Sequence, residues 1–258
     1  MSRVPAFRDH FSAVAPAYAR ARPAYPPALY AALATLAPGH ALAWDCGTGN
    51  GQAAHGLVTH FDAVVATDPS AQQLAAAPPH ARITFRVGRE AASGLAPGSV
   101  DLVTAAQAAH WFDVDAFYAE ARRVLRPGGV IAVWCYNLCR IAPPIDERLG
   151  TFYTATVGPF WPPGREHVEA AYHTLPFPFP ELSLPPFAME QRWTLADLGA
   201  YVRTWSAVTR FITARGFDPV TALLEEITPL WGSVAEPRRV TWLLAVRAGR
   251  REAAGPRP

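Results

Sequence analysis

The 258-residue sequence contains no lysine, so all 23 of its basic residues are arginines. This absence excludes two classes of enzyme, because a Walker-type phosphate loop requires its lysine and a Schiff-base enzyme requires a lysine amine. Cysteine is also scarce, and Cys46, Cys135 and Cys139 are too few for a disulfide framework. Because the pair Cys135 and Cys139 has no second pair beside it, the spacing does not indicate a zinc site, and we expect no bound metal.

Long apolar runs are absent as well. No stretch of about 18 apolar residues is present, so no transmembrane helix is predicted. The first ten residues lack the apolar core of a signal peptide, and we therefore expect a cytoplasmic protein without a membrane partner. The formal net charge is +2 and the arginines are spread along the chain, which does not indicate a nucleic-acid partner. The sequence leaves open whether the protein is a monomer or a homodimer.

Short apolar segments alternate with helical patterns through the first half of the chain. The segments predicted to be strands are 41–45, 63–68, 82–87, 100–106 and 130–134. Because the residues between them have the apolar spacing of helices, the pattern predicts an α/β fold with a doubly wound parallel sheet. In such a sheet, ligands bind beyond the carboxyl ends of the strands.

The regular alternation stops near residue 137, where segments rich in proline and aromatic residues begin. Because a regular sheet does not tolerate so many prolines, we expect helices and irregular segments that form a lid. The predicted organisation is a core at 1–137 with an N-terminal cap segment, a substrate-side lobe at 138–235, a final core strand at 236–250 and a flexible tail at 251–258.

A glycine-rich turn follows the first predicted strand and reads Asp45-Cys46-Gly47-Thr48-Gly49-Asn50-Gly51. Such a turn exposes backbone N–H groups and lets a ligand lie against the main chain. Asp45 places a negative charge at the mouth of the turn, which suits a cationic ligand better than a pyrophosphate. The register also departs from the dinucleotide-binding pattern G-x-G-x-x-G, because Gln52 stands where the third glycine should fall. Asp68, about twenty residues later, suits an acid that binds ribose hydroxyls.

This turn resembles motif I of the class I S-adenosylmethionine-dependent methyltransferases, and later segments support the resemblance in order. Residues 99–103, followed by Gln107 and the run 110–113, are similar to the fourth-strand segment of the methyltransferase type 11 group. Residues 125–129 are similar to the turn before the fifth strand of that family, and residues 11–26 resemble the N-terminal segment of trans-aconitate methyltransferase-like proteins. The resemblance implies a Rossmann-like seven-stranded sheet, order 3-2-1-4-5-7-6, with strand 7 antiparallel.

The resemblance also implies a site for S-adenosylmethionine. Asp45 would hold the methionine ammonium, directly or through water, and Asp68 would bind the ribose hydroxyls. The turn residues Gly47, Thr48 and Gly49 would lie beside the methionine portion. The other cofactor-binding residues implied in this way are Arg89 and Glu90 along the adenine, Gln107 near the methionine end, and Tyr18 and Arg22 closing over the cofactor.

The acceptor side of the site is marked by fewer residues. Trp111 and Tyr136 are the candidate substrate contacts, and His110 is the candidate general base. A carboxylate acceptor needs only placement, for which arginine is suited, whereas a phenol or an amine needs deprotonation. We therefore predict methyl transfer to a small-molecule acceptor, a carboxylate or another O or N nucleophile, by in-line displacement that depends chiefly on positioning.

Two other functions remain open from the sequence. An NAD-linked oxidoreductase would use the same fold, although the missing third glycine and Asp45 speak against it. A protein that binds S-adenosylmethionine without transferring a methyl group would carry the same motifs. The candidate residues also have structural interpretations, because Asp45 and Asp68 could cap helices, Glu90 could be a solvated charge, and His110 and Trp111 could serve packing.

Overall fold

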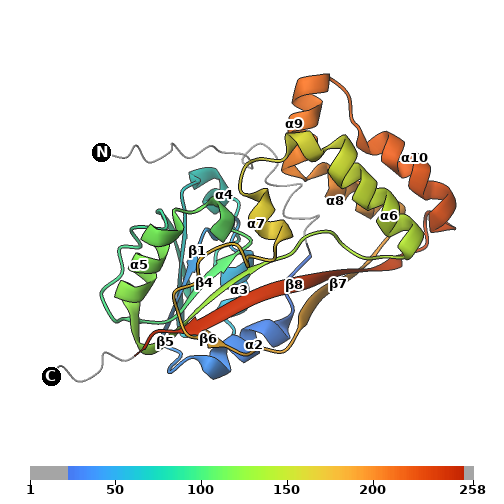
Figure 1. The fold of residues 1–258 in the computed structure, drawn as a ribbon. Coiled ribbons are helices and arrows are strands. Elements are labelled where there is room, and N and C mark those ends of the chain that lie inside the picture. The colour runs from blue at the N-terminus through green and yellow to red at the C-terminus, as the bar shows by residue number, and fades with distance from the viewer. Residues whose placement is uncertain (1–22, 253–258) are drawn as a thin grey trace.

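A computed structural model describes residues 23–252 as an open sheet flanked by helices, with a helical lobe beyond one end of the sheet (Figure 1). The order across the sheet is β3-β2-β1-β4-β5-β8-β6, and β7 also pairs with β8. The strands are β1 (Leu42–Cys46), β2 (Ala63–Asp68), β3 (Ile83–Val87), β4 (Val100–Ala106), β5 (Leu125–Cys135), β6 (Glu181–Leu182), β7 (Phe187–Trp193) and β8 (Arg238–Arg250).

The helices fall into two groups. Those between the strands of the first half are α2 (Pro27–Leu36), α3 (Gln52–Leu57), α4 (Ala71–Ala75), the short 3-10 helix η2 (Ala109–Trp111) and α5 (Val114–Val124). Those after β5 are α6 (Pro143–Thr151), η3 (Phe152–Thr156), η4 (Gly158–Phe160), α7 (Arg165–Glu169), α8 (Leu195–Arg203), α9 (Ser206–Arg215) and α10 (Val220–Trp231). Figure 1 shows α6, α8, α9 and α10 gathered in the lobe at the upper right.

The sheet order expected from the family resemblance is confirmed when β8 is counted as the seventh strand. Strands β1 to β5 are parallel to their neighbours, and β8 is antiparallel to β5. The position of the sixth strand is shared by two segments, because β6 pairs with β8 at 248–249 and β7 pairs with β8 at 238–244. Pro185 and Pro186 lie between β6 and β7, and proline cannot donate to a strand ladder.

The apolar side chains of the strands alternate between two cores, as a doubly wound sheet requires. Ala43 and Leu102 face the core that contains α2 and α3, whereas Trp44 and Val103 face the core that contains α5. Period-two alternation explains this division, because successive side chains of a strand point to opposite faces. The first core continues without a break into α8 and α10 of the lobe, so the lobe shares its apolar packing with one face of the sheet.

The fifth strand differs from the sequence expectation. The run Pro127-Gly128-Gly129 was expected to separate α5 from a strand at 130–134, but β5 begins at Leu125, directly after α5. Leu125 pairs with Val100, and the register then shifts before Leu102 pairs with Val130. The irregular stretch is held by the chain after β8, since the N–H of Gly128 donates to the carbonyl of Arg251.

Candidate functional site

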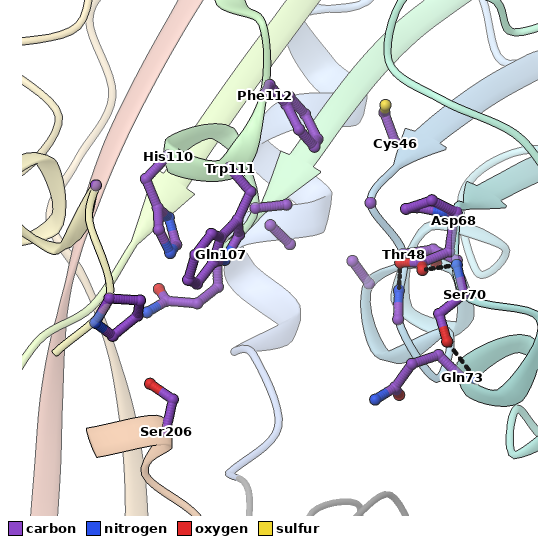
Figure 2. Close-up of a pocket in the computed structure, with 18 of the residues that line it drawn as sticks. Cys46, Thr48, Asp68, Ser70, Gln73, Gln107, His110, Trp111, Phe112 and Ser206 are labelled. Atoms are coloured by element: carbon purple, nitrogen blue, oxygen red, sulfur yellow. Dashed lines mark hydrogen bonds between the residues drawn. The ribbon is translucent and has the colours of Figure 1, made fainter. Parts of the chain in front are cut away.

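A cavity of about 870 Å³ lies beyond the carboxyl ends of β1, β2, β4 and β5. Its sheet side is formed by the turns after these strands and after β3, and its other side by α7, α8, α9 and the segment before α7. Figure 2 shows Asp68, Ser70 and Gln73 on one side of the open space and Gln107, His110 and Trp111 on the other. The fold therefore brings the predicted acceptor residues and most of the predicted cofactor residues to one cavity.

The glycine turn is compact because two backbone groups of the turn donate to one carbonyl. The N–H groups of Gly47 and Thr48 lie 2.8 and 3.0 Å from the carbonyl oxygen of Thr67. Gly47 has a φ of +69°, and a Cβ atom there would lie 2.7 Å from the Cβ of Ala108 and 2.9 Å from the ring of Phe112. Only glycine satisfies both the backbone conformation and the close approach.

Asp45 lies beneath the turn and is not among the described residues that line the cavity. Its side chain is fully buried, and its two oxygens accept hydrogen bonds from the hydroxyls of Thr48 at 2.6 Å and Thr104 at 2.7 Å. Burial raises the pKa of Asp45 to about 6, although the two hydroxyl donors act in the opposite direction. The structure thus places Thr48 between Asp45 and the cavity, and direct contact of Asp45 with a ligand stays a prediction.

Asp68 lines the cavity at the end of β2. Its carboxylate accepts one hydrogen bond from the N–H of Gly49 and one from the N–H of Ser70, both at 2.8 Å. Ser70 in turn caps α4 by accepting from the N–H of Gln73. The two backbone donors therefore fix the orientation of the Asp68 carboxylate at the cavity wall.

The side chain of Gln107 is held by the backbone after β5. Its amide nitrogen donates to the carbonyl of Tyr136, and its amide oxygen accepts from the N–H of Tyr136 at 2.8 Å. Gln107 also has a positive φ of 53°, which is uncommon for a residue with a side chain. Gln107 therefore joins the turns after β4 and β5 at the cavity wall. Arg89 and Glu90 line the same cavity after β3.

His110 and Trp111 stand side by side on η2, with ring centroids 4.8 Å apart. The Nδ1 atom of His110 lies 2.8 Å from the hydroxyl of Tyr172. Burial lowers the pKa of His110 to about 3, and the charges of Arg165 and His167 act in the same direction. The imidazole is therefore neutral near pH 7 and is a weak base.

We expect His110→Ala to lower kcat by less than about tenfold when the acceptor is already ionised, because a working general base contributes about 100-fold or more. The pH profile of wild type should also contain no step near pH 6.5 that His110→Ala removes, since His110 does not titrate there. Initial rates of both proteins from pH 5 to 9 measure this. A loss of 100-fold or more in kcat for His110→Ala would show that His110 takes a proton in the reaction.

Several cavity residues were not predicted from the sequence. Tyr136 and Trp111 line the cavity as expected, and Tyr18 and Arg22 lie outside the described residues. The unpredicted lining residues from the lobe include Trp161, Arg165, Tyr201, Trp205, Ser206 and Arg210. The only sequence signal for them is the aromatic and proline-rich run at 159–164, because aromatic residues pack into cores as often as they line sites.

Known proteins resemble this chain over most of its length. A family model described as a methyltransferase domain matches residues 44–133. A “putative methyltransferase” of Dictyostelium discoideum is 30% identical over 225 residues, an alignment that covers 86% of each chain. The chain belongs to the S-adenosylmethionine-dependent methyltransferases.

Solved structures agree with this assignment. The structure of a “putative type II methyltransferase” from Anaeromyxobacter dehalogenans is 45% identical and has a TM-score of 0.85, covering 90% of this chain and 99% of that one. A phosphoethanolamine N-methyltransferase of Haemonchus contortus, solved with S-adenosylhomocysteine, is 17% identical with a TM-score of 0.51 and covers 98% of this chain and 62% of that one. The latter shares the fold. Membership in the methyltransferase family overturns the oxidoreductase alternative, and the trans-aconitate-like subgroup stays a prediction.

The cavity residues fit S-adenosylmethionine as the cofactor. Gly47 and Gly49 line the cavity, so the turn presents its main chain there, and hydrogen bonds to two backbone N–H groups fix the carboxylate of Asp68 beside it. Among residues 23–252, no group of three metal-binding side chains is found, and no helix is long and apolar enough to cross a bilayer. The sheet side of the cavity presents main-chain, carboxylate and amide groups.

Proposed function

We propose that the methyltransferase transfers the methyl group to a small-molecule acceptor held between the sheet and the lobe. One observation supports this proposal most strongly: a single cavity extends from the glycine turn at Gly47 to the aromatic side chains of Trp161 and Trp205. Its volume of about 870 Å³ falls in the upper part of the range for small-molecule sites.

The sheet side of the cavity is proposed to hold the cofactor. Asp68 would bind the ribose hydroxyls, and Arg89 and Glu90 would meet the adenine. The turn at 47–49 would lie against the methionine portion, with Thr48 held in place by the buried carboxylate of Asp45. Gln107 would keep the turns after β4 and β5 at a fixed separation through its paired bonds to Tyr136.

The lobe side of the cavity is proposed to place the acceptor. S-adenosylmethionine supplies a sulfonium-bound methyl group that is already electrophilic, so the chain need not provide a nucleophile. Trp111, Tyr136 and Trp161 can exclude water and surround the cationic centre with aromatic faces. Holding the two reactants in line then lowers the barrier, chiefly by positioning. Neutral His110 can orient an acceptor by a hydrogen bond without removing a proton.

Two measurements test the proposed function. Calorimetry should show binding of S-adenosylmethionine, and radiolabelled methyl groups should pass from it to small molecules in a metabolite extract. Label found only in tRNA, DNA or protein would reject the small-molecule acceptor. Binding without transfer to any fraction would instead favour a protein that binds the cofactor without catalysis.

A further inference from the structure

The guanidinium of Arg165 is fixed at the lobe side of the cavity by three neighbours. Its Nε atom donates to the hydroxyl of Tyr153 at 2.6 Å, and its Nη2 atom donates to Oδ1 of Asn137. Its central carbon lies 4.4 Å from the ring centroid of Trp161, so one face is covered by an aromatic ring. The long side chain is therefore held in one position before any ligand binds.

The charge of Arg165 has no matching carboxylate in the described part of the chain. The ion pairs found within residues 23–252 involve five other arginines. The hydroxyl of Tyr153 donates to Glu169 at 2.6 Å, so a neutral group separates this acid from the guanidinium. Within residues 23–252, no hydrogen bond of Arg165 uses Nη1, which leaves these N–H groups for a ligand. A half-buried cation without a counterion is costly unless an anion completes it.

The acidic residues that line the cavity are confined to one of its sides. The acids that line it, Asp68, Glu90 and Asp113, all come from the sheet side. The described lining residues from 137 onward include Arg165 and Arg210 and no acid. The charge of Arg165 also reaches its neighbour, since it contributes to the lowered pKa of His110. The acceptor side of the cavity is therefore electropositive.

We propose that Arg165 determines acceptor specificity by pairing with a carboxylate or phosphate group of the acceptor, which is therefore an anion. This inference rests on the proposed function and adds the chemical class of the acceptor. Arg165 is suited to the task, because a guanidinium matches planar and tetrahedral oxyanions and stays charged at all relevant pH values. Asn137 and Tyr153 are positioning residues that aim it.

Pairs of candidate acceptors that differ only in charge test whether the acceptor is an anion. The panel contains carboxylic acids with their amides, such as glutarate with glutaramide and 4-hydroxybenzoate with 4-hydroxybenzamide, and phosphomonoesters with their parent alcohols. We expect methyl transfer to an anionic member of a pair and at least about 30-fold lower kcat/KM for its neutral partner. The group of acceptors that is methylated, carboxylic acids or phosphomonoesters, identifies the oxyanion that Arg165 binds.

Variants of Arg165 and of its neighbour Asn137 test whether Arg165 binds the anionic acceptor. Arg165→Gln should raise the KM for the anionic acceptor at least about 30-fold with a smaller change in kcat, and Arg165→Lys should recover part of the loss. Asn137→Asp should act like Arg165→Gln, because the aspartate supplies Arg165 with a carboxylate partner while preserving the shape of the side chain. Arg148→Gln is the matched control, since Arg148 is exposed on α6 and does not line the cavity. Affinity for S-adenosylhomocysteine should stay within about twofold of wild type in all four proteins, which shows that they are folded.

A measurement of thermal stability, which requires no methyl transfer, completes the test. With S-adenosylhomocysteine bound, glutarate or a phosphomonoester should raise the melting temperature of wild type but not of Arg165→Gln. Transfer to neutral partners at equal or higher efficiency would overturn the inference and leave the proposed function intact. Unaltered KM in both Arg165→Gln and Asn137→Asp would overturn it too. Label confined to macromolecules would instead overturn the proposed function itself.

Discussion

Replacing Asp68 by alanine is expected to weaken binding of S-adenosylmethionine about 100-fold, because two charge-assisted hydrogen bonds together contribute about 3 kcal/mol. The substitution removes a carboxylate that lines the cavity and also releases the N–H groups of Gly49 and Ser70. Two causes of loss therefore combine: the ribose contact disappears and the end of the glycine turn loses an anchor. Calorimetric titration of wild type and variant with S-adenosylmethionine measures the difference.

Asp68→Asn separates the two causes. The asparagine keeps one oxygen acceptor for the backbone, so it should retain more of the turn than Asp68→Ala and fall between that variant and wild type in affinity. Asp115 provides the control, because it is exposed in the first turn of α5 and does not line the cavity. Wild-type affinity in Asp68→Ala would remove this residue from the cofactor site.

Asp45→Asn is expected to stabilise the free protein while it weakens cofactor binding. Burial raises the pKa of Asp45 from its ordinary value of 3.8 to about 6, so the folded protein favours the neutral form. The contribution of this group to stability is therefore complete below the unfolded pKa and is lost as the pH rises to about 6. Asparagine is neutral at every pH, so the variant should gain about 3 kcal/mol over wild type between pH 4 and pH 6, and hold it above pH 6.

Binding of the cofactor should become weaker in Asp45→Asn, although the free protein becomes more stable. Thr48 donates its hydroxyl proton to Asp45, which turns the hydroxyl oxygen into an acceptor and places an anion behind it. An amide at position 45 removes that charge, and we expect at least about tenfold weaker binding of S-adenosylmethionine at pH 7.5. Urea unfolding from pH 4 to 8, with and without cofactor, measures both effects. A difference in stability that does not change with pH would contradict the raised pKa.

The sheet could be predicted from the sequence because its strands are short, apolar and separated by helical patterns. The end of β1 at the glycine turn lies where the sequence places it. The start of β5 could not be predicted, because proline and glycine indicate a break, whereas pairing with Val100 and with the chain after β8 keeps residues 125–129 in the strand. The split of the sixth strand depends on the length of β8, which local patterns do not show.

The candidate site was predictable from the sequence where its residues stand at or just after the ends of predicted strands. Asp68, Gln107 and His110 follow strand ends, so parallel topology alone brings them to one edge. Arg165 was not predictable, since its position depends on contacts with Asn137 and Tyr153, which lie 28 and 12 residues away in the chain. The burial of Asp45 behind Thr48 was hidden for a similar reason, because Thr104 closes over it from a neighbouring strand.

The last strand of the sheet sets an order of events during synthesis on the ribosome. β8 lies between β5 and β6, yet it is made only after residues 136–237 have been translated. Until then the nascent chain exposes the edge of β5, an apolar strand that can pair with other chains. Closing a contact across so long a stretch of chain is also slow. A chain released before residue 238 would carry the whole glycine turn and an unprotected sheet edge, which makes it a substrate for chaperones and proteases rather than a smaller enzyme.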